Sequence, residues 1–239
     1  MSPLEQLLYE SCKKINVELN EKQISQFMDY KDMLLEWNEK MNLTAITDER
    51  EIMLKHFADC LMICSDLDLD GKKVIDVGTG AGFPGVPVKI ACPGAQMTLL
   101  DSLNKRINFL KELSEKLGLE NVDCVHMRAE DGGADKNLRE SFDLCISRAV
   151  ANLAVLSEYC LPFVKVGGTF ISMKGPDVEE EVNEAKKAIK VLGGEIKAIK
   201  KMEIPETDIV HSLIFIEKVK PTPAKYPRKA GKAKKEPIM

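Results

Sequence analysis

The chain has 239 residues, 44% of them hydrophobic, which allows one sizeable core and excludes two large independent domains. The formal net charge of −4 hides an asymmetry. From Lys218 onward seven Lys and one Arg stand against one Glu, so this end carries +7 and the rest of the chain −11. No run is apolar enough over a sufficient length to span a bilayer, and the first residues lack a secretory pattern. The seven cysteines are scattered and odd in number, which is typical of reduced thiols. We therefore expect a cytoplasmic protein that does not enter a membrane.

The first part of the chain predicts helices. The run SPLE at residues 2–5 combines a hydroxyl cap, a proline at the first helical position and a glutamate that reaches back to the cap. Apolar residues at helical spacing predict a second helix over 21–40, and a third helix is expected after Asp48, where an acid three residues later completes a capping pattern. We expect residues 1–68 to form a helical N-terminal extension.

The pattern changes after residue 71 to short apolar runs separated by helical segments. The runs are VIDV, MTLLD, VDCVHM, FDLCISRA and GTFISMK. Strands that alternate with helices predict a mostly parallel sheet covered by helices on both faces. Two strand-like runs at 195–204 and 209–219, with only a polar turn between them, predict an antiparallel hairpin at the sheet edge. We expect an α/β domain over residues 69–220.

Proline and lysine dominate the remaining segment, residues 221–239. We expect this basic C-terminal tail to lie outside the core. Its charge favours a polyanionic partner, since lysines near phosphates release condensed counterions, and Tyr226 between Lys225 and Arg228 offers a stacking ring among cations. An idle, solvated tail is the competing interpretation.

The run VIDVGTGAGFPGVPVKI, residues 74–90, places glycines directly after a predicted strand and before a helix. This arrangement lets the backbone approach a ligand closely. Two nucleotide cofactors compete for it. The stretch matches G-x-G-x-x-G, which favours a dinucleotide, but Pro84 and Pro87 flank the third glycine of that match. Taken instead as Asp76 followed by G-x-G-x-G, it has the form with which many methyltransferases hold S-adenosylmethionine, and the prolines then open the next helix.

Five motifs, in order along nearly the whole chain, are more specific than the glycines. They are WNEKMNLT at 37–44, DVGTGAGFPGVPVKI at 76–90, RAE at 128–130, SRA at 147–149 and YPRK at 226–229. With them the sequence resembles the bacterial glucose-inhibited division protein B (RsmG) family of 16S ribosomal RNA guanine-N7 methyltransferases.

The resemblance implies a class I, Rossmann-like S-adenosylmethionine-dependent methyltransferase domain and a 16S ribosomal RNA or small-subunit particle as partner. We expect a monomer, although no sequence feature reports the oligomeric state. Asp101 is expected to contact the ribose hydroxyls, because it ends the second predicted strand. With Asp101 added, the cofactor-binding residues expected are Gly78, Phe83, Asp101, Ala129, Glu130 and Arg148.

The expected chemistry needs no catalytic residue and no metal. Guanine N7 carries a lone pair and no proton, so it attacks a sulfonium methyl group without a general base. His56, Cys60 and Cys64 share a helix face, but the outer two lie about 12 Å apart at ~1.5 Å per residue, too far for one ion, so we expect them to face the core. Helix capping and turn formation explain Asn38, Asn42 and Thr44 as well as a functional role does, in which this extension covers the site or contacts RNA. An NAD-linked oxidoreductase and a non-catalytic RNA-binding protein are the alternatives.

Overall fold

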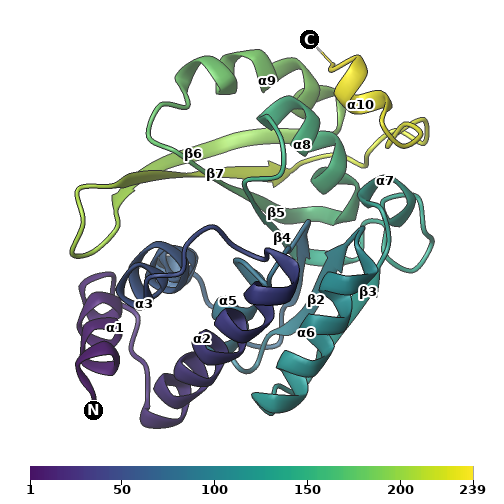
Figure 1. Ribbon diagram of the computed structural model, residues 1–239. Coiled ribbons are helices and arrows are strands. Elements are labelled where there is room, and N and C mark those ends of the chain that lie inside the picture. The colour runs from purple at the N-terminus through teal and green to yellow at the C-terminus, as the bar shows by residue number, and fades with distance from the viewer. Residues whose placement is uncertain (239) are drawn as a thin grey trace.

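A computed structural model describes residues 1–238, and Met239, the last residue of the expected tail, lies outside the described residues. One seven-stranded sheet crosses the molecule in the order β3-β2-β1-β4-β5-β7-β6 (Figure 1). Its strands are β1 (Lys73–Val77), β2 (Gln96–Asp101), β3 (Val122–His126), β4 (Phe142–Arg148), β5 (Val164–Lys174), β6 (Gly194–Glu203) and β7 (Val210–Lys218).

Strands β1 to β5 pair in parallel, so their carboxyl ends meet at one edge of the sheet. Val77 lies opposite Leu100 of β2, and Asp76 lies opposite Ile146 of β4. Strand β7 runs antiparallel to both β5 and β6. The expected mostly parallel sheet with an antiparallel C-terminal hairpin is therefore confirmed.

Helices cover both faces of the sheet (Figure 1). The core of the first face includes residues of α1 (Pro3–Lys14), α2 (Glu21–Met41), a π-helical stretch η1 (Ile52–Ala58), α4 (Asp59–Leu61), a 3-10 turn η2 (Met62–Asp66), α5 (Gly85–Ala91) and α6 (Asn104–Lys116). The short helix α3 (Glu49–Glu51) precedes η1 and buries no residue. The second face packs against α7 (Ala129–Gly132), α8 (Leu153–Cys160), the turn η3 (Leu161–Phe163), α9 (Glu179–Val191) and α10 (Lys232–Lys235). In β1, Val74 joins the first core and Ile75 the second, because successive strand residues point to opposite faces.

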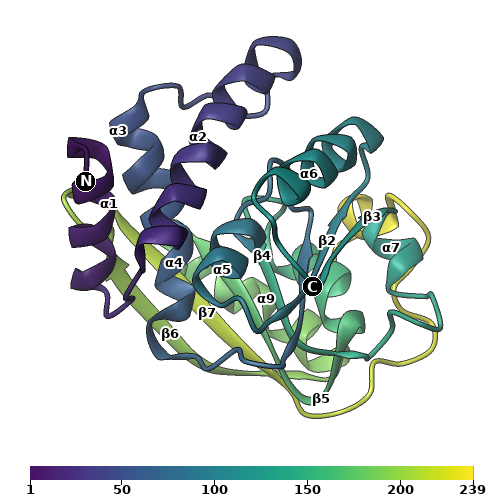
Figure 2. The same cartoon turned by 90° about the horizontal axis from the view of Figure 1, so that it is seen from below.

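The N-terminal helices share the core of the first face, as Figure 2 shows with α2 in front of the strands beside α5. The capping pattern at Ser2 is formed as expected, and Asp48 caps the third helix by accepting from Glu51 N at 2.9 Å. Gln23 Nε2 donates to Ile90 O at 2.8 Å and Gln26 Nε2 to Leu117 O at 2.7 Å. These bonds join α2 to the ends of α5 and α6. Within the described part of the chain, no helix is both long and apolar enough to cross a membrane.

The expectation that the basic tail lies outside the core is wrong. Thr222 and Ala233 are buried, and Arg228 makes a double contact with Glu158 of α8, with Nη2 2.6 Å from Oε2 and Nε 2.9 Å from Oε1. Glu158 is 1% exposed, so its charge needs a partner, and composition does not reveal that the partner comes from the tail. Lys218 is also buried, donating to Leu161 O and Val164 O. Two of the eight cations counted at this end therefore serve the fold.

Candidate active site at the carboxyl edge of the sheet

A cavity of about 540 Å³ opens where β1, β2 and β4 end. It is bounded by the glycine loop after β1, by the segments after β2, β3 and β4, by the N-terminal helices and by the tail. All six residues expected from the sequence line it: Gly78, Phe83, Asp101, Ala129, Glu130 and Arg148. The volume is within the usual range for a small-molecule site.

The glycine loop needs glycine for both backbone and space. Gly78, Gly80 and Gly82 have φ of +74°, +63° and +101°. A Cβ on Gly78 would lie 2.6 Å from Val150 Cγ2, so a side chain there is excluded by sterics as well as by strain. The Tyr30 hydroxyl donates to Ala81 O at 2.6 Å. Helix α2 thus fixes the loop from the side opposite the strands.

Asp76 supports the loop from below. It is fully buried, and its Oδ2 accepts from Thr79 Oγ1 at 2.6 Å and from Gly85 N at 2.8 Å. Burial raises the pKa of Asp76 to about 7, against hydrogen bonds from Thr79 and Gly85 that favour the ionised form. Because this carboxyl occupies the first backbone N–H of α5, the helix start does not offer that donor to a pyrophosphate. This local geometry disfavours the dinucleotide interpretation of the glycines.

Asp101 ends β2 at the cavity wall. Its Oδ2 accepts from Gly80 N at 3.0 Å and lies 3.3 Å from Arg106 Nη1, while Oδ1 accepts from Leu103 N at 2.8 Å. Each carboxylate oxygen has two lone pairs, so Oδ1 can accept a further hydrogen bond. The carboxylate is therefore held rigidly by two backbone amides and still borders the cavity.

The tail closes the end of the cavity beyond β3. Glu130 Oε1 accepts from Gly231 N at 3.0 Å, and Gly231 and Lys234 line the cavity with Ala129 and Glu130. The sequence did not predict tail residues in this wall. No local signal marked them, because the contact joins residues about one hundred positions apart in the chain.

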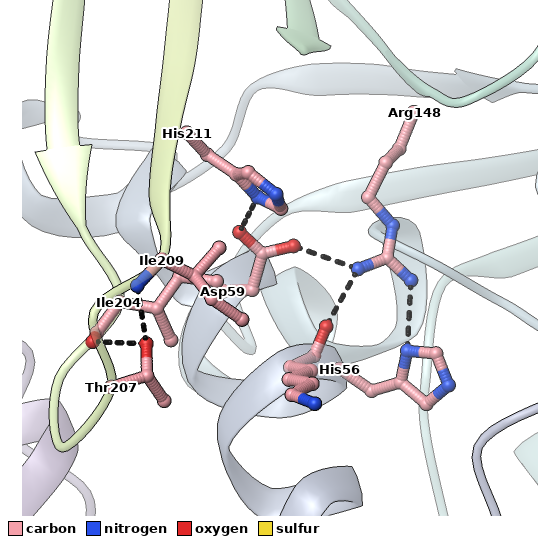
Figure 3. A network of polar contacts seen from close by, with 8 residues as sticks. His56, Asp59, Arg148, Ile204, Thr207, Ile209 and His211 are labelled. Atoms are coloured by element: carbon pink, nitrogen blue, oxygen red, sulfur yellow. Dashed lines mark hydrogen bonds and ion pairs between the residues drawn. The ribbon is translucent and has the colours of Figure 1, made fainter. Parts of the chain in front are cut away.

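Arg148, the last residue of β4, belongs to a network of polar contacts with the N-terminal region and β7 (Figure 3). Its Nη1 donates to Asp59 Oδ2 at 2.8 Å and to Lys55 O at 3.2 Å. The other oxygen of Asp59 lies 2.7 Å from His211 Nδ1. Asp59 is fully buried, so one carboxylate from the N-terminal region orients side chains from β4 and β7.

His56 completes this wall. Arginine only donates, so the 3.2 Å contact from Arg148 Nη2 makes His56 Nδ1 the acceptor, and Nε2 carries the proton toward Thr44 Oγ1 at 2.8 Å. Burial, followed by the positive charge of Arg148, lowers the pKa of His56 to about 4, so the ring is neutral at pH 7. The ring stacks on Phe83 with centroids 4.4 Å apart. His56 was expected only to face the core; it is buried and also lines the cavity, as Thr44 does.

Comparison with solved structures defines the class of fold. A SAM-dependent methyltransferase from Aquifex aeolicus matches with a TM-score of 0.53 at 18% identity, over 74% of this chain and 97% of that one. A 16S rRNA (adenine(1408)-N(1))-methyltransferase variant from Catenulisporales acidiphilia, with cosubstrate SAM, matches with a TM-score of 0.52 at 16% identity, over 65% and 88%. The fold is the Rossmann-like fold of SAM-dependent methyltransferases, as expected.

Sequence relatives define the family. The family described as GidB, rRNA small subunit methyltransferase G, matches residues 23–210. Ribosomal RNA small subunit methyltransferase G of Alkaliphilus oremlandii is 56% identical over 236 residues, 98% of this chain and 99% of that protein. The protein of the same name from Clostridium perfringens strain 13 is 54% identical over 233 residues, 97% and 98% of the two chains. The chain belongs to the rRNA small subunit methyltransferase G family, which confirms the resemblance noted in the sequence.

Proposed function

We propose that this protein transfers the methyl group of S-adenosylmethionine to N7 of a guanine in 16S ribosomal RNA. The observation that carries the proposal is the coincidence of family membership over nearly the whole chain with a cavity built by the family's motifs at the carboxyl edge of the sheet. Open α/β sheets bind ligands at this edge.

The cavity fits the cofactor. The loop after Asp76 is bare enough for close backbone approach, and Asp101 keeps a lone pair for a ribose hydroxyl. We propose that Gly78 and Phe83 border the amino-acid and sulfonium end, and that Ala129 and Glu130 border the adenine. We propose Arg148 for the methionine carboxylate, since its guanidinium lines the cavity at the end of β4.

When bound there, S-adenosylmethionine supplies an electrophilic methyl group. Because guanine N7 attacks with a free lone pair, the protein needs only to orient the guanine and the methyl donor and to exclude water. Holding two reactants in line is worth at most about 7–11 kcal/mol. The stacked rings of His56 and Phe83, with centroids 4.4 Å apart, form a wall of the cavity for this purpose. The buried ring of Tyr30 packs behind Phe83, with centroids 5.4 Å apart. A neutral His56 adds no positive charge beside a sulfonium.

Incubation of purified enzyme with methyl-labelled cofactor and either deproteinised 16S RNA or small subunits tests the proposal. N7-methylguanosine in a nuclease digest, analysed by mass spectrometry, is the expected product. Label on another atom would refute the guanine-N7 assignment, and binding of RNA without transfer would favour the non-catalytic alternative. Thermal stabilisation by NAD in place of S-adenosylmethionine would favour an oxidoreductase.

We propose that exposed tail lysines aid RNA binding. Replacement by Gln of three of them should lower the salt slope of binding by about 2 to 3, at ~0.7–0.9 per phosphate contact. The three are Lys229, Lys232 and Lys235. A matched control replaces three exposed lysines of α9, namely Lys186, Lys187 and Lys190. An equal slope for both triple variants would remove the tail from the RNA interface.

We also propose that the enzyme acts as a monomer in the cytoplasm, where its ribosomal RNA substrate is made. Light scattering should give the chain mass of 26.7 kDa across a concentration series. A mass near twice this value would exclude the monomer.

A further inference from the structure

A second cavity of about 470 Å³ lies beside the first. It is bounded by the ends of β4 and β5, by the turn between β6 and β7, and by the N-terminal region. His56, Arg148 and Ala149 line both cavities. These three residues therefore lie where the two cavities meet.

Strand order places the second cavity on one side of the first. The cofactor cavity extends from the segment after β3 to the end of β4, and the second cavity extends from β4 to β5 and β7. If Asp101 of β2 holds the ribose and Ala129 and Glu130 border the adenine, as proposed above, the methyl group would lie toward β4. A methyl acceptor must approach in line from the side away from the sulfur. The space beyond Arg148 lies in that direction.

The lining of the second cavity suits a nucleotide base. Its apolar residues are Ile46, Met173, Ile204 and Ile209. Its charged residues are cationic, and none of the described residues that line it is acidic. An aromatic base with acceptor atoms on its edge, attached to phosphates, meets both needs: apolar walls for the ring faces and donors for the acceptors.

The walls of this cavity are held in place by hydrogen bonds (Figure 3). Thr207 Oγ1 donates to Ile204 O at 2.9 Å and accepts from Ile209 N at 3.1 Å, which fixes the turn that carries both isoleucines. Asp59 holds Arg148 and His211 from behind. Hydrogen bonds therefore hold this turn and the Arg148 side chain in place, as a site that must position a reacting atom requires.

We propose that the second cavity receives the guanine that is methylated, with the half-buried Ile46 and Ile209 against the ring and Arg148 between the base and the methyl donor. This inference rests on the proposed function. The guanine O6 accepts from the cationic wall, and N7, beside O6 on the same edge, stays free to face the cofactor cavity. In the transfer the N7 lone pair forms the N–CH₃ bond, the S–CH₃ bond breaks, and its electron pair stays on sulfur. The products are N7-methylguanine, which carries the positive charge, and the neutral thioether, with no proton transferred.

Gly175 allows a direct test. It lines the second cavity and not the first, its φ lies outside the strained region, and a Cβ there would meet nothing within 4 Å. Gly175→Trp should therefore fill the base site without disturbing the fold. The matched control is Val166→Trp, which adds the same side chain at a half-exposed position in β5 that lines neither cavity.

Gly175→Trp should lower kcat/KM for 16S RNA at least 20-fold, with the melting temperature and the Kd for S-adenosylmethionine close to those of the wild type. The Kd for RNA should stay within about threefold, because phosphate contacts dominate RNA affinity. Val166→Trp should retain full activity. Full activity of Gly175→Trp, beside an active wild-type enzyme, would overturn the base site and leave the proposed function intact. Absence of N7 methylation by the wild-type enzyme is the separate result that defeats the function itself.

A second measurement does not depend on any variant. An RNA with 6-thioguanosine at the methylated position, irradiated with wild-type enzyme and the demethylated cofactor, should crosslink to residues 173–175 or 204–209. Crosslinks confined to other segments would overturn the proposal, including in the case where Gly175→Trp proves unstable.

Discussion

Asp76 offers the sharpest test of how the cofactor loop is held. Its carboxyl is fully buried beneath the glycine loop, its Oδ2 accepts two hydrogen bonds, and its Oδ1 finds no partner among the described residues. Burial raises the pKa of Asp76 from 3.8 to about 7. Asp76→Asn keeps an oxygen that accepts from Thr79 and Gly85 but removes the titration.

The sign and size of the effect follow from linkage. Because the folded-state pKa lies above the unfolded one, the stabilising contribution of Asp76 is fully present below about pH 4 and is lost as the pH rises through 7. One pKa unit corresponds to about 1.4 kcal/mol, so the contribution falls by about 2 to 3 kcal/mol between pH 5 and pH 8. The Asn variant has no such loss. Its free energy of unfolding relative to the wild type should therefore rise by that amount over the same interval.

Urea unfolding of both proteins at pH 5, 6, 7 and 8 measures this difference, and every other titrating group cancels in it. Cofactor affinity of the variant should stay within severalfold of the wild type, since the accepting oxygen remains. A difference in unfolding free energy that is constant from pH 5 to pH 8 would refute the raised pKa of the buried Asp76. A difference that falls with pH would reverse its sign.

Three further substitutions test other parts of the site. Gly78→Val should weaken S-adenosylmethionine binding at least tenfold in calorimetry with the fold retained in circular dichroism, and an unchanged Kd would show that clearance there is not needed. Arg228→Ala leaves Glu158 buried without its ion-pair partner, so the free energy of unfolding should fall by about 3 kcal/mol, whereas a loss below about 1 kcal/mol would mean that the tail is not anchored there. Tyr30→Phe removes the bond to Ala81 O and should cost about 1 kcal/mol of stability and severalfold in cofactor affinity, and equal affinity would exclude a role of α2 in holding the loop.

Much of the architecture was predictable because it depends on local patterns. A run such as VIDV is apolar on both sides of the strand, which occurs where helices cover both faces of a parallel sheet. The glycines after Asp76 marked the ligand loop because only glycine adopts their left-handed φ without cost. The six residues expected at the cofactor came from strand ends and from motifs, and all line one cavity. Their binding roles stay a prediction.

Tertiary structure alone decided which distant groups complete the site. His56 lies on a helix face that periodicity assigns to the core, and only its contacts with Arg148 and Thr44 show that it also walls the cavity. Asp59 and His211 belong to segments about one hundred and fifty positions apart, and no spacing rule joins them. The position of the basic tail was predicted wrongly for the same reason. A count of charges does not show that Arg228 of the tail pairs with the buried Glu158.

The sequence alone determined the order of strands and helices along the chain, the glycine loop after Asp76 and the chemistry expected at this loop. Side-chain periodicity and backbone dihedral preferences decide these features, and both act over a few residues. The closing of the tail over the cavity, the buried carboxylate behind Arg148 and the second cavity beside the first came only from the folded chain, because charge burial and packing depend on which segments meet in space.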